Sequence, residues 1–145
     1  MLGFIEGIGQ KVTFAVSTYY GIGKPSNANE YLDDLVKEMG HIKINGIEFR
    51  EIKYNILING FLCDLPARSF IKCVICINGY PGCHYCNQEL YINSVVFPEL
   101  NYPCRSDESF REQVDTGHHK GILILTTLNI DMVHYFPLIL CIFYT

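Results

Sequence analysis

The sequence predicts an α/β fold, and three observations support that prediction. Stretches rich in β-branched and aromatic residues alternate with a stretch whose apolar residues recur at helical spacing. Within residues 55–71, strand-forming residues lead to one carboxylate, Asp64, and Pro66 then suits the first turn of a helix. The chain has 145 residues, of which 49% are apolar and 18% charged, so it can bury a single core.

Charge and targeting features exclude several classes of function. Eleven lysines and arginines against 15 acids give a net charge of −4. We therefore expect no strong nucleic-acid footprint, because nonspecific affinity for nucleic acids requires lysines and arginines that neutralise phosphates. The first residues lack the basic region, long apolar core and cleavage site of a signal peptide, and no basic nuclear-localisation run is present. The apolar run 136–144 is shorter than the roughly 20 residues that span a bilayer, so we expect no membrane partner.

The cysteine content indicates a reducing compartment. Seven cysteines are an odd number, which cannot pair completely, and no secretory signal accompanies them. We therefore expect thiols or metal ligands rather than a disulfide framework.

A strand and a capped helix are predicted first. Residues 11–20 are rich in β-branched and aromatic residues, as expected of a half-buried strand. Asn27 followed by Glu30 is typical of a capping box at a helix start. Four apolar residues then recur at helical spacing: Leu32, Leu35, Val36 and Met39. Gly40 is expected to end this helix.

A hairpin is predicted next. Asn45-Gly46 is the dipeptide best suited to a tight turn, because both residues tolerate positive φ, so residues 41–44 are expected to pair with a strand that begins at Ile47. That second strand is expected to continue to Leu62 as a central strand of the sheet, with a bend at Gly60. It would deliver Asp64 to the end of the sheet.

Shorter elements are predicted in the second half. A helix is expected over residues 67–74, and residues 78–82 form a turn that leads into a Cys-x-x-Cys motif. Residues 91–97 are expected to form a short strand. Ser106, followed by two acids, marks the start of a helix that reaches about Val114.

Asp64 has two interpretations. A lone aspartate at a strand-to-helix junction commonly caps the helix by accepting a backbone N–H. Alternatively, its carboxylate binds a divalent metal ion, which requires partner carboxylates from elsewhere in the fold. No partner is identified by spacing.

Cys83 and Cys86 form a Cys-x-x-Cys motif in a glycine-containing turn, where two thiolates can reach one zinc ion and supply half of a tetrahedral site. The candidates for the remaining ligands are Cys73, Cys76, Cys104, His84, His118, His119 and His134. Alternatively, the cysteines are unreactive thiols without a ligand. A thioredoxin-like redox pair is disfavoured, because that motif should open a helix directly after a strand.

Four blocks, in chain order, resemble the transposase domain of CACTA-type (En/Spm-like, Tnp2-like) DNA transposons. These blocks are YYGIGKPSNANEYLDDLVKEM, FLCDLPARSF, NGYPGCHYC and NIDMVHYFPL. The resemblance extends over residues 12–138, which is almost the whole chain.

This resemblance implies a ribonuclease H-like fold with a mixed sheet and helices. In such DDE enzymes two aspartates and one glutamate hold two Mg²⁺ ions for DNA cleavage and strand transfer. The resemblance identifies Asp64 with the second acid and so with a magnesium ligand. It identifies Cys83 and Cys86 with a zinc-binding insertion between the second and third acids.

The chain departs from the family pattern at three places. The first acid is expected upstream of the YYG block, and Glu6 lacks its aspartate-glycine context. After Pro137-Leu138 the family continues with an aspartate and a Met-His pair, whereas this chain continues with Ile139 and Leu140. Ile77 stands where relatives often have a histidine. Since one acid cannot hold two Mg²⁺ ions, we expect this copy to be inactive.

The sequence is therefore interpreted as one truncated transposase-like domain, residues 1–145. It comprises a sheet and helix core (about 12–75), a cysteine-containing insertion (76–120) and an aberrant tail (121–145). Its ancestral partner is DNA, and the resemblance favours a nuclear location, with the cytoplasm as the alternative. Two alternative interpretations are that the chain is a zinc-stabilised, non-enzymatic protein-interaction module or that it is an unrelated small α/β thiol enzyme.

Overall fold

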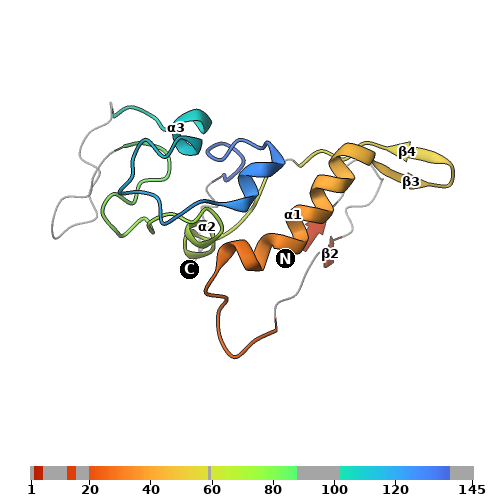
Figure 1. Ribbon diagram of the computed structural model, residues 1–145, viewed down its shortest axis with the longest axis horizontal. Helices are drawn as coiled ribbons and strands as arrows, with labels where there is room; N and C mark the ends of the chain where they lie inside the picture. The colour runs from red at the N-terminus through yellow and green to blue at the C-terminus, as the bar shows by residue number, and fades with distance from the viewer. Residues whose placement is uncertain (1, 5–12, 16–19, 59, 88–101, 138–145) are drawn as a thin grey trace, which may run out of the picture.

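The computed structural model describes residues 2–4, 13–15, 20–58, 60–87 and 102–137. Their fold is mixed α/β, with helices and two separate two-stranded antiparallel sheets (Figure 1). The elements in order are β1 (Leu2–Phe4), β2 (Thr13–Ala15), α1 (Ala28–Asn45), β3 (Ile47–Phe49), β4 (Ile52–Tyr54), α2 (Leu65–Ile71), α3 (Asp107–Arg111) and the 3₁₀ helix η1 (Ile124–Leu128). None of the described helices is long and apolar enough to cross a bilayer.

Helix α1 begins where the sequence predicts but ends later. The Asn27 side chain accepts from the backbone N–H groups of Asn29 and Glu30, and its amide donates to the Glu30 carboxylate at 3.0 Å. The prediction that Gly40 ends the helix is wrong. The helix continues to Asn45, and its C-cap is Gly46, whose φ is 70° and whose N–H donates to the Ile42 carbonyl.

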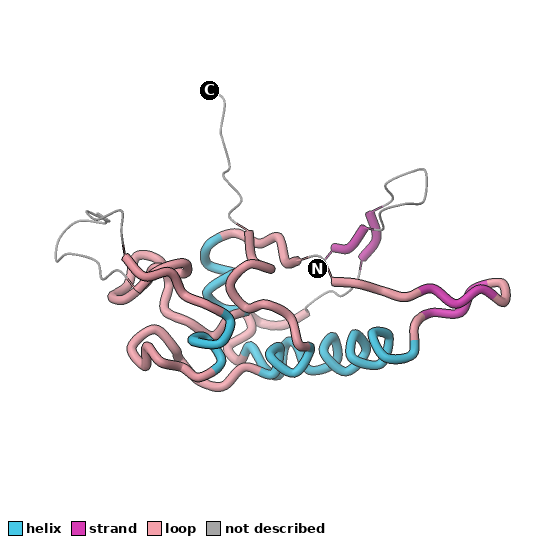
Figure 2. The backbone as a smooth tube through the Cα atoms, turned by 90° about the horizontal axis from the view of Figure 1, so that it is seen from above, coloured by secondary structure: helices cyan, strands magenta, loops and turns pink. Residues whose placement is uncertain are grey.

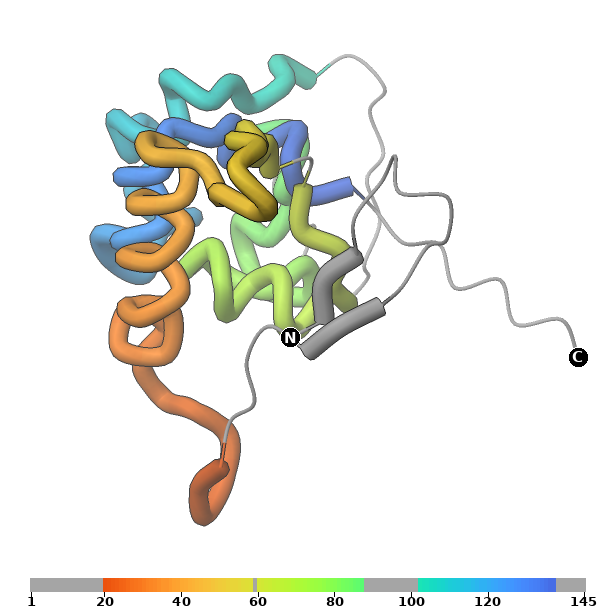
Figure 3. The backbone as a smooth tube through the Cα atoms, turned by 90° about the vertical axis from the view of Figure 1, so that its right-hand side faces the viewer, coloured from red at the N-terminus to blue at the C-terminus, as the bar shows by residue number. Residues whose placement is uncertain are grey.

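Packing against η1 explains the extra length of α1. A Cβ on Gly40 would lie 3.8 Å from Leu128 Cδ2, so the helix passes close to η1 there. One turn further on, Lys43 Nζ donates to the Leu128 carbonyl at 2.6 Å. These contacts outweigh the roughly 1 kcal/mol that a glycine costs inside a helix. Figure 3 shows α1 running alongside the segment that contains η1.

The predicted hairpin is shifted along the chain. Residues 41–44 belong to α1 rather than to a strand, because Asn45-Gly46 ends the helix instead of forming a β-turn. The observed hairpin pairs β3 with β4 around Arg50 and Glu51, whose φ values are 51° and 63°. Positive φ at both central residues is the requirement of a type I′ hairpin turn. The hairpin projects from the end of α1 (Figures 1 and 2).

The central strand expected before Asp64 is also wrong for the described residues. Residues 55–58 and 60–64 lie in no strand. Instead, the Phe61 N–H donates to the Tyr135 carbonyl at 2.7 Å, and a Cβ on Gly60 would meet that carbonyl at 2.9 Å. The two chain segments approach so closely that a side chain at position 60 would meet the Tyr135 carbonyl, which explains the glycine there. The single mixed sheet predicted from the sequence is replaced by two separate sheets.

The remaining predictions have mixed outcomes. Strand β2 confirms residues 13–15 of the first predicted strand and pairs with β1, whereas Tyr20, at its predicted end, lies in no strand. Helix α2 is confirmed but spans Leu65–Ile71, since Cys73 has a φ of 54° and the chain turns there.

Helix α3 begins after Ser106 as expected, with Ser106 and Ser109 forming a reciprocal capping box, and ends at Arg111. The predicted strand 91–97 and the tail beyond Pro137 lie outside the described residues.

The core joins the first helix to the last third of the chain. Helix α1 contributes Leu32 and Val36, α2 contributes Ile71, and most of the other members follow residue 122. The buried apolar residues of this cluster are Leu32, Val36, Ile71, Val74, Phe110, Leu123, Leu125, Leu128, Ile130, Met132, Val133 and Phe136. The residues expected to form an aberrant tail therefore include much of the core, as far as Phe136.

Candidate functional site

Asp64 is the N-cap of α2. Its Oδ1 accepts a hydrogen bond from the Ala67 backbone N–H at 2.8 Å, and the residue is exposed. Pro66 lies in the first turn, where its missing N–H costs nothing. The helix-capping role left open by the sequence is therefore present in the structure.

The side chain of Arg68, one turn after Asp64, joins three segments of the chain. Arg68 is 1% exposed. Its Nη1 donates to the Tyr85 hydroxyl at 3.3 Å, and its Nη2 donates to the Pro137 carbonyl. The Tyr85 hydroxyl donates in turn to the Phe136 carbonyl at 2.7 Å. We call these residues the Arg68 junction: Arg68, Tyr85, Phe136 and Pro137.

Lys72 is a second buried cation on α2's C-terminal side. It is 1% exposed, and its Nζ lies 5.0 Å and 5.5 Å from the ring centroids of Phe110 and Phe136. Burial, followed by repulsion from Arg68, lowers the pKa of Lys72 to about 8. The two aromatic faces offset part of the cost of burying the ammonium group.

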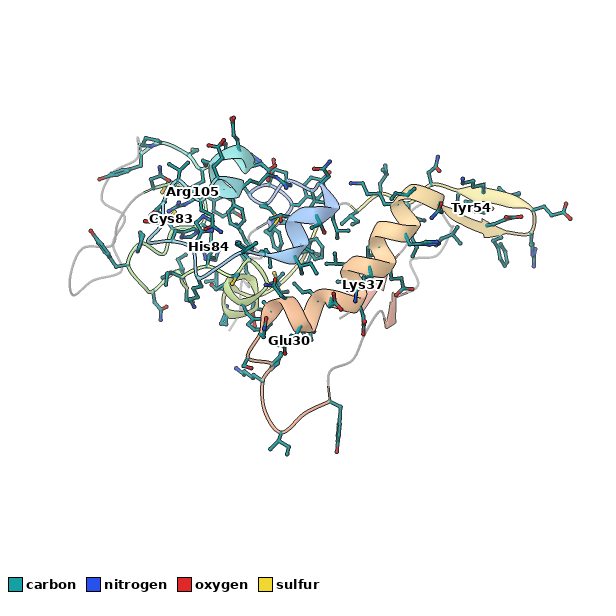
Figure 4. The ribbon with its side chains drawn as sticks, viewed as in Figure 1. Glu30, Lys37, Tyr54, Cys83, His84 and Arg105 are labelled. Atoms are coloured by element: carbon teal, nitrogen blue, oxygen red, sulfur yellow. The ribbon has the colours of Figure 1, made fainter. Side chains whose placement is uncertain are left out.

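Arg105 anchors the turn that carries the Cys-x-x-Cys motif. Its Nη2 forms an ion pair with Asp115 at 2.6 Å, and its Nε donates to the Cys83 carbonyl at 3.0 Å. Burial opposes ionisation of Asp115, but the hydrogen bond and charge of Arg105 outweigh it and lower the pKa of this carboxyl. Figure 4 shows Cys83, His84 and Arg105 together in the loop-rich part of the molecule, far from the hairpin residue Tyr54.

The structure brings Cys83 and Cys86 together. Their Sγ atoms are 3.0 Å apart, and the Cys86 N–H donates to Cys83 Sγ at 3.3 Å. This separation lies between the 2.05 Å of a disulfide and the about 3.8 Å expected of two thiolates on one zinc ion. A main-chain bridge from Cys86 to Cys104 joins this turn to the segment that contains Arg105.

Two histidines are buried near this turn. His84 is 2% exposed and His118 is 0% exposed. Burial lowers the pKa of each to about 4, so both rings are neutral at pH 7. His84 Nε2 lies 3.2 Å from the Ile75 carbonyl, and His118 Nδ1 lies 2.9 Å from the Pro81 carbonyl.

The other candidate ligands are more scattered. His119 is half-buried with its ring 4.7 Å from that of Phe110, whereas His134 is exposed and forms an ion pair with Asp131 when protonated. Cys104 is exposed, and Cys73 and Cys76 are half-buried. Within the described ranges, no three histidine, cysteine, aspartate or glutamate side chains are grouped so that they could hold a metal ion.

Sequence reasoning missed the buried cations Arg68, Lys72 and Arg105. One signal was present, because Ile71 and Lys72 follow Arg68 by three and four positions in a predicted helix, which puts Lys72 on the same side as Arg68. Two cations on the apolar face of a helix are unusual and point to burial. Arg105 carries no such signal.

The chain matches no known protein-family model, and no similar curated protein or solved structure was found.

The capping role of Asp64 predicts different effects for two substitutions. Asp64→Ala removes the acceptor for the Ala67 N–H and should lower the free energy of unfolding by about 1 kcal/mol. Asp64→Asn retains an acceptor oxygen and should change stability little. Urea denaturation of both variants beside the wild type tests this; equal effects of alanine and asparagine would contradict the capping role.

The buried ammonium of Lys72 predicts a stabilising substitution. With its pKa lowered from 10.5 to about 8, Lys72 destabilises the folded state fully below pH 8, and the cost declines as the pH rises towards 10.5. Lys72→Met should therefore raise the free energy of unfolding by about 1 to 3 kcal/mol at pH 7 and by less at pH 9. Denaturant unfolding at both pH values measures this gain.

The matched control is Lys120→Met, because Lys120 is exposed. It should leave stability unchanged at either pH. A Lys72→Met protein that is less stable than the wild type at pH 7 would show that the ammonium group stabilises the fold.

Proposed function

We propose that this chain derives from the core of a CACTA-type DDE transposase and does not carry out strand transfer by itself. The observation that supports the proposal most is that all four family-like blocks are in contact, the fourth through its backbone carbonyls. Tyr31 of the first block lies with its ring centroid 5.9 Å from that of Phe70 in the second. The Arg68 junction then joins the second block to the third, through Tyr85, and to the fourth, through Phe136 and Pro137.

The proposed ancestral reaction is Mg²⁺-dependent cleavage and joining of DNA at transposon ends. Two-metal chemistry needs carboxylates that bridge and flank both ions. Asp64 is the acid that the resemblance assigns to this role, and one of its oxygens already accepts the Ala67 N–H. We infer that a single exposed acid at a helix start cannot hold two ions, so the chain needs other segments for catalysis. The ancestral substrate, DNA, favours a nuclear location.

The Cys83–Cys86 turn is the proposed zinc-binding remnant of the cysteine-containing insertion. Two sulfur atoms 3.0 Å apart on a turn anchored by Arg105 provide the soft donors that zinc prefers. Bound zinc would crosslink the turn and stabilise it.

A second candidate function is a protein-interaction module, and the hairpin β3–β4 favours it. The cross-strand pairs Ile47–Tyr54 and Phe49–Ile52 put four apolar side chains on one face of the hairpin. All four are exposed, from 43% for Ile47 to 59% for Phe49. A two-stranded hairpin is marginally stable alone, so an apolar face on one suits association with another chain.

Two tests address the transposase proposal. Genomic DNA on either side of the coding region should encode an aspartate-glycine block upstream and a Met-His block downstream of the FPL element. Unrelated sequence on both sides would contradict the origin.

The second test is enzymatic. The purified chain, incubated with Mg²⁺ and labelled duplexes carrying transposon ends, should neither cleave nor join DNA, and Asp64→Asn should behave as the wild type does. Magnesium-dependent cleavage that Asp64→Asn abolishes would overturn the proposed lack of activity.

The interaction module predicts association through the hairpin. Sedimentation velocity of the wild type should show concentration-dependent self-association, which Ile52→Ser should weaken by at least about tenfold through the loss of apolar contact area. Glu48→Gln is the matched control, because Glu48 alternates with the apolar residues and lies on the other face. A wild type that remains monomeric at every concentration would contradict self-association.

A further inference from the structure

The sulfur atoms of Cys83 and Cys86 are close enough to become bonded after a small movement. They are 3.0 Å apart, and a disulfide bond is about 2.05 Å long, so a shift of about 1 Å would close it. Both side chains are half-buried, so a small reagent can reach them. In the part of the chain that the structure describes, no third potential metal ligand is grouped with them. The chemistry available to the pair there is that of two thiols.

The main chain around the pair is held by the segment that contains Arg105. The Arg105 Nε donates to the Cys83 carbonyl at 3.0 Å, and its backbone N–H donates to the Tyr85 carbonyl at 2.7 Å. The Cys86 main chain forms a bridge with Cys104. Because these contacts already hold the turn, a bond between the two sulfur atoms would cost little further conformational entropy.

The turn does not have the form of a thiol oxidoreductase site. Residues 83–85 lie in no helix or strand, and Cys86 forms only an isolated bridge. In thioredoxin-like enzymes the Cys-x-x-Cys motif opens a helix, whose N-terminus stabilises the reactive thiolate. The arrangement therefore favours a bond that forms and breaks within this chain over one that is transferred to another protein.

We propose that Cys83 and Cys86 are a site of reversible oxidation, at which a low-molecular-weight disulfide such as glutathione disulfide converts the two thiols into a disulfide. The thiol of one cysteine displaces a glutathione thiol and forms a mixed disulfide, and the second cysteine then displaces the other glutathione. The two cysteines lose two electrons to the glutathione disulfide, and their two protons leave on the two glutathione thiols. The inference does not depend on zinc binding or on the proposed origin of the chain.

The bond would fasten the turn to the core. Tyr85 lies between the two cysteines, and its hydroxyl belongs to the Arg68 junction. A disulfide that encloses Tyr85 restricts the unfolded chain and keeps the turn in its folded form. Oxidation should therefore stabilise the folded protein, and reduction should loosen the contact between Tyr85 and Arg68.

Cys104 is the competing partner for Cys86. The two residues form an antiparallel bridge in which their neighbours, rather than the pair itself, exchange the main-chain hydrogen bonds. Side chains at such a position lie close together. Cys83 is nevertheless favoured over Cys104, because its sulfur is already 3.0 Å from that of Cys86.

The test equilibrates the full chain, freed of metal by a chelator, in buffers with graded ratios of glutathione to glutathione disulfide. Free thiols are then alkylated and located by peptide mass spectrometry. In the wild type, Cys83 and Cys86 should lose alkylation together, at a more reducing ratio than the other described cysteines. Cys83→Ser should shift the protection of Cys86 towards oxidising ratios by more than about tenfold. Cys104→Ser is the matched control and should leave the transition where it is in the wild type.

The pattern of alkylation can also overturn the inference. It is wrong if Cys83 and Cys86 both stay alkylatable in excess glutathione disulfide. It is also wrong if Cys86 pairs with Cys104 and Cys83 remains a free thiol.

A second measurement on the wild type does not depend on the variants folding. Its Tm should be about 4 to 8 °C higher in glutathione disulfide than in reduced glutathione, since the bond closes a short loop. An oxidised pair with an unchanged or lower Tm would show that the bond does not fit the folded turn, and would overturn the inference.

Added zinc separates this inference from the zinc remnant proposed above. If the remnant binds zinc, saturating Zn²⁺ should protect both thiols from oxidation. Zinc without effect on the transition would contradict the remnant and leave the disulfide standing. Thiols that bind zinc but do not join in the metal-free chain would support the remnant and overturn the disulfide.

Discussion

The guanidinium of Arg68 is the constraint on which the architecture of the second half of the chain depends. A buried cation must be hydrogen-bonded, since its desolvation costs several kcal/mol. Arg68 Nη1 and Nη2 meet part of this need with the Tyr85 hydroxyl and the Pro137 carbonyl, while its Nε has no partner among the described residues. These two bonds determine where the cysteine-bearing turn and the segment after η1 lie relative to α2. The stacked rings of Phe61 and Phe136, with centroids 5.1 Å apart, bring the segment before Asp64 to the same place.

The three buried cations among the described residues, Arg68, Lys72 and Arg105, are each stabilised in a different way. Arg105 has a carboxylate partner in Asp115, whereas Lys72 has two aromatic rings near its ammonium group, and burial still lowers its pKa. Burial is the main cause of the lowered pKa of His84 and of His118. The positive charge in this interior lowers both pKa values further, because it opposes protonation of the rings. Burial, reinforced by this positive charge, therefore keeps both imidazoles neutral at pH 7.

Local signals in the sequence predicted local structure well. The caps at Asn27, Asp64 and Ser106 are each confirmed, because a cap depends on side chains within three residues of the helix start. Predictions failed where two local signals competed. Gly40 and Gly46 could each end α1, and only the contact of α1 with η1, about 90 residues away, decides between them. The prediction of a central strand also failed because of a long-range contact, since the Phe61 N–H donates to the Tyr135 carbonyl rather than to a neighbouring strand.

The difference between local signals and long-range contacts also explains which parts of the site the sequence could predict. Cys83 and Cys86 are close because they share one turn, and that closeness is visible in their spacing. His84 and His118 are 34 positions apart, and the structure brings them together through backbone pairing of residues 74–75 with 118–119. Asp64 shows the limit of a local signal, because its position predicts the helix cap that the structure shows but identifies no partner carboxylate. Distinguishing a structural from a catalytic acid would require carboxylates that other segments bring to it, which no local pattern predicts.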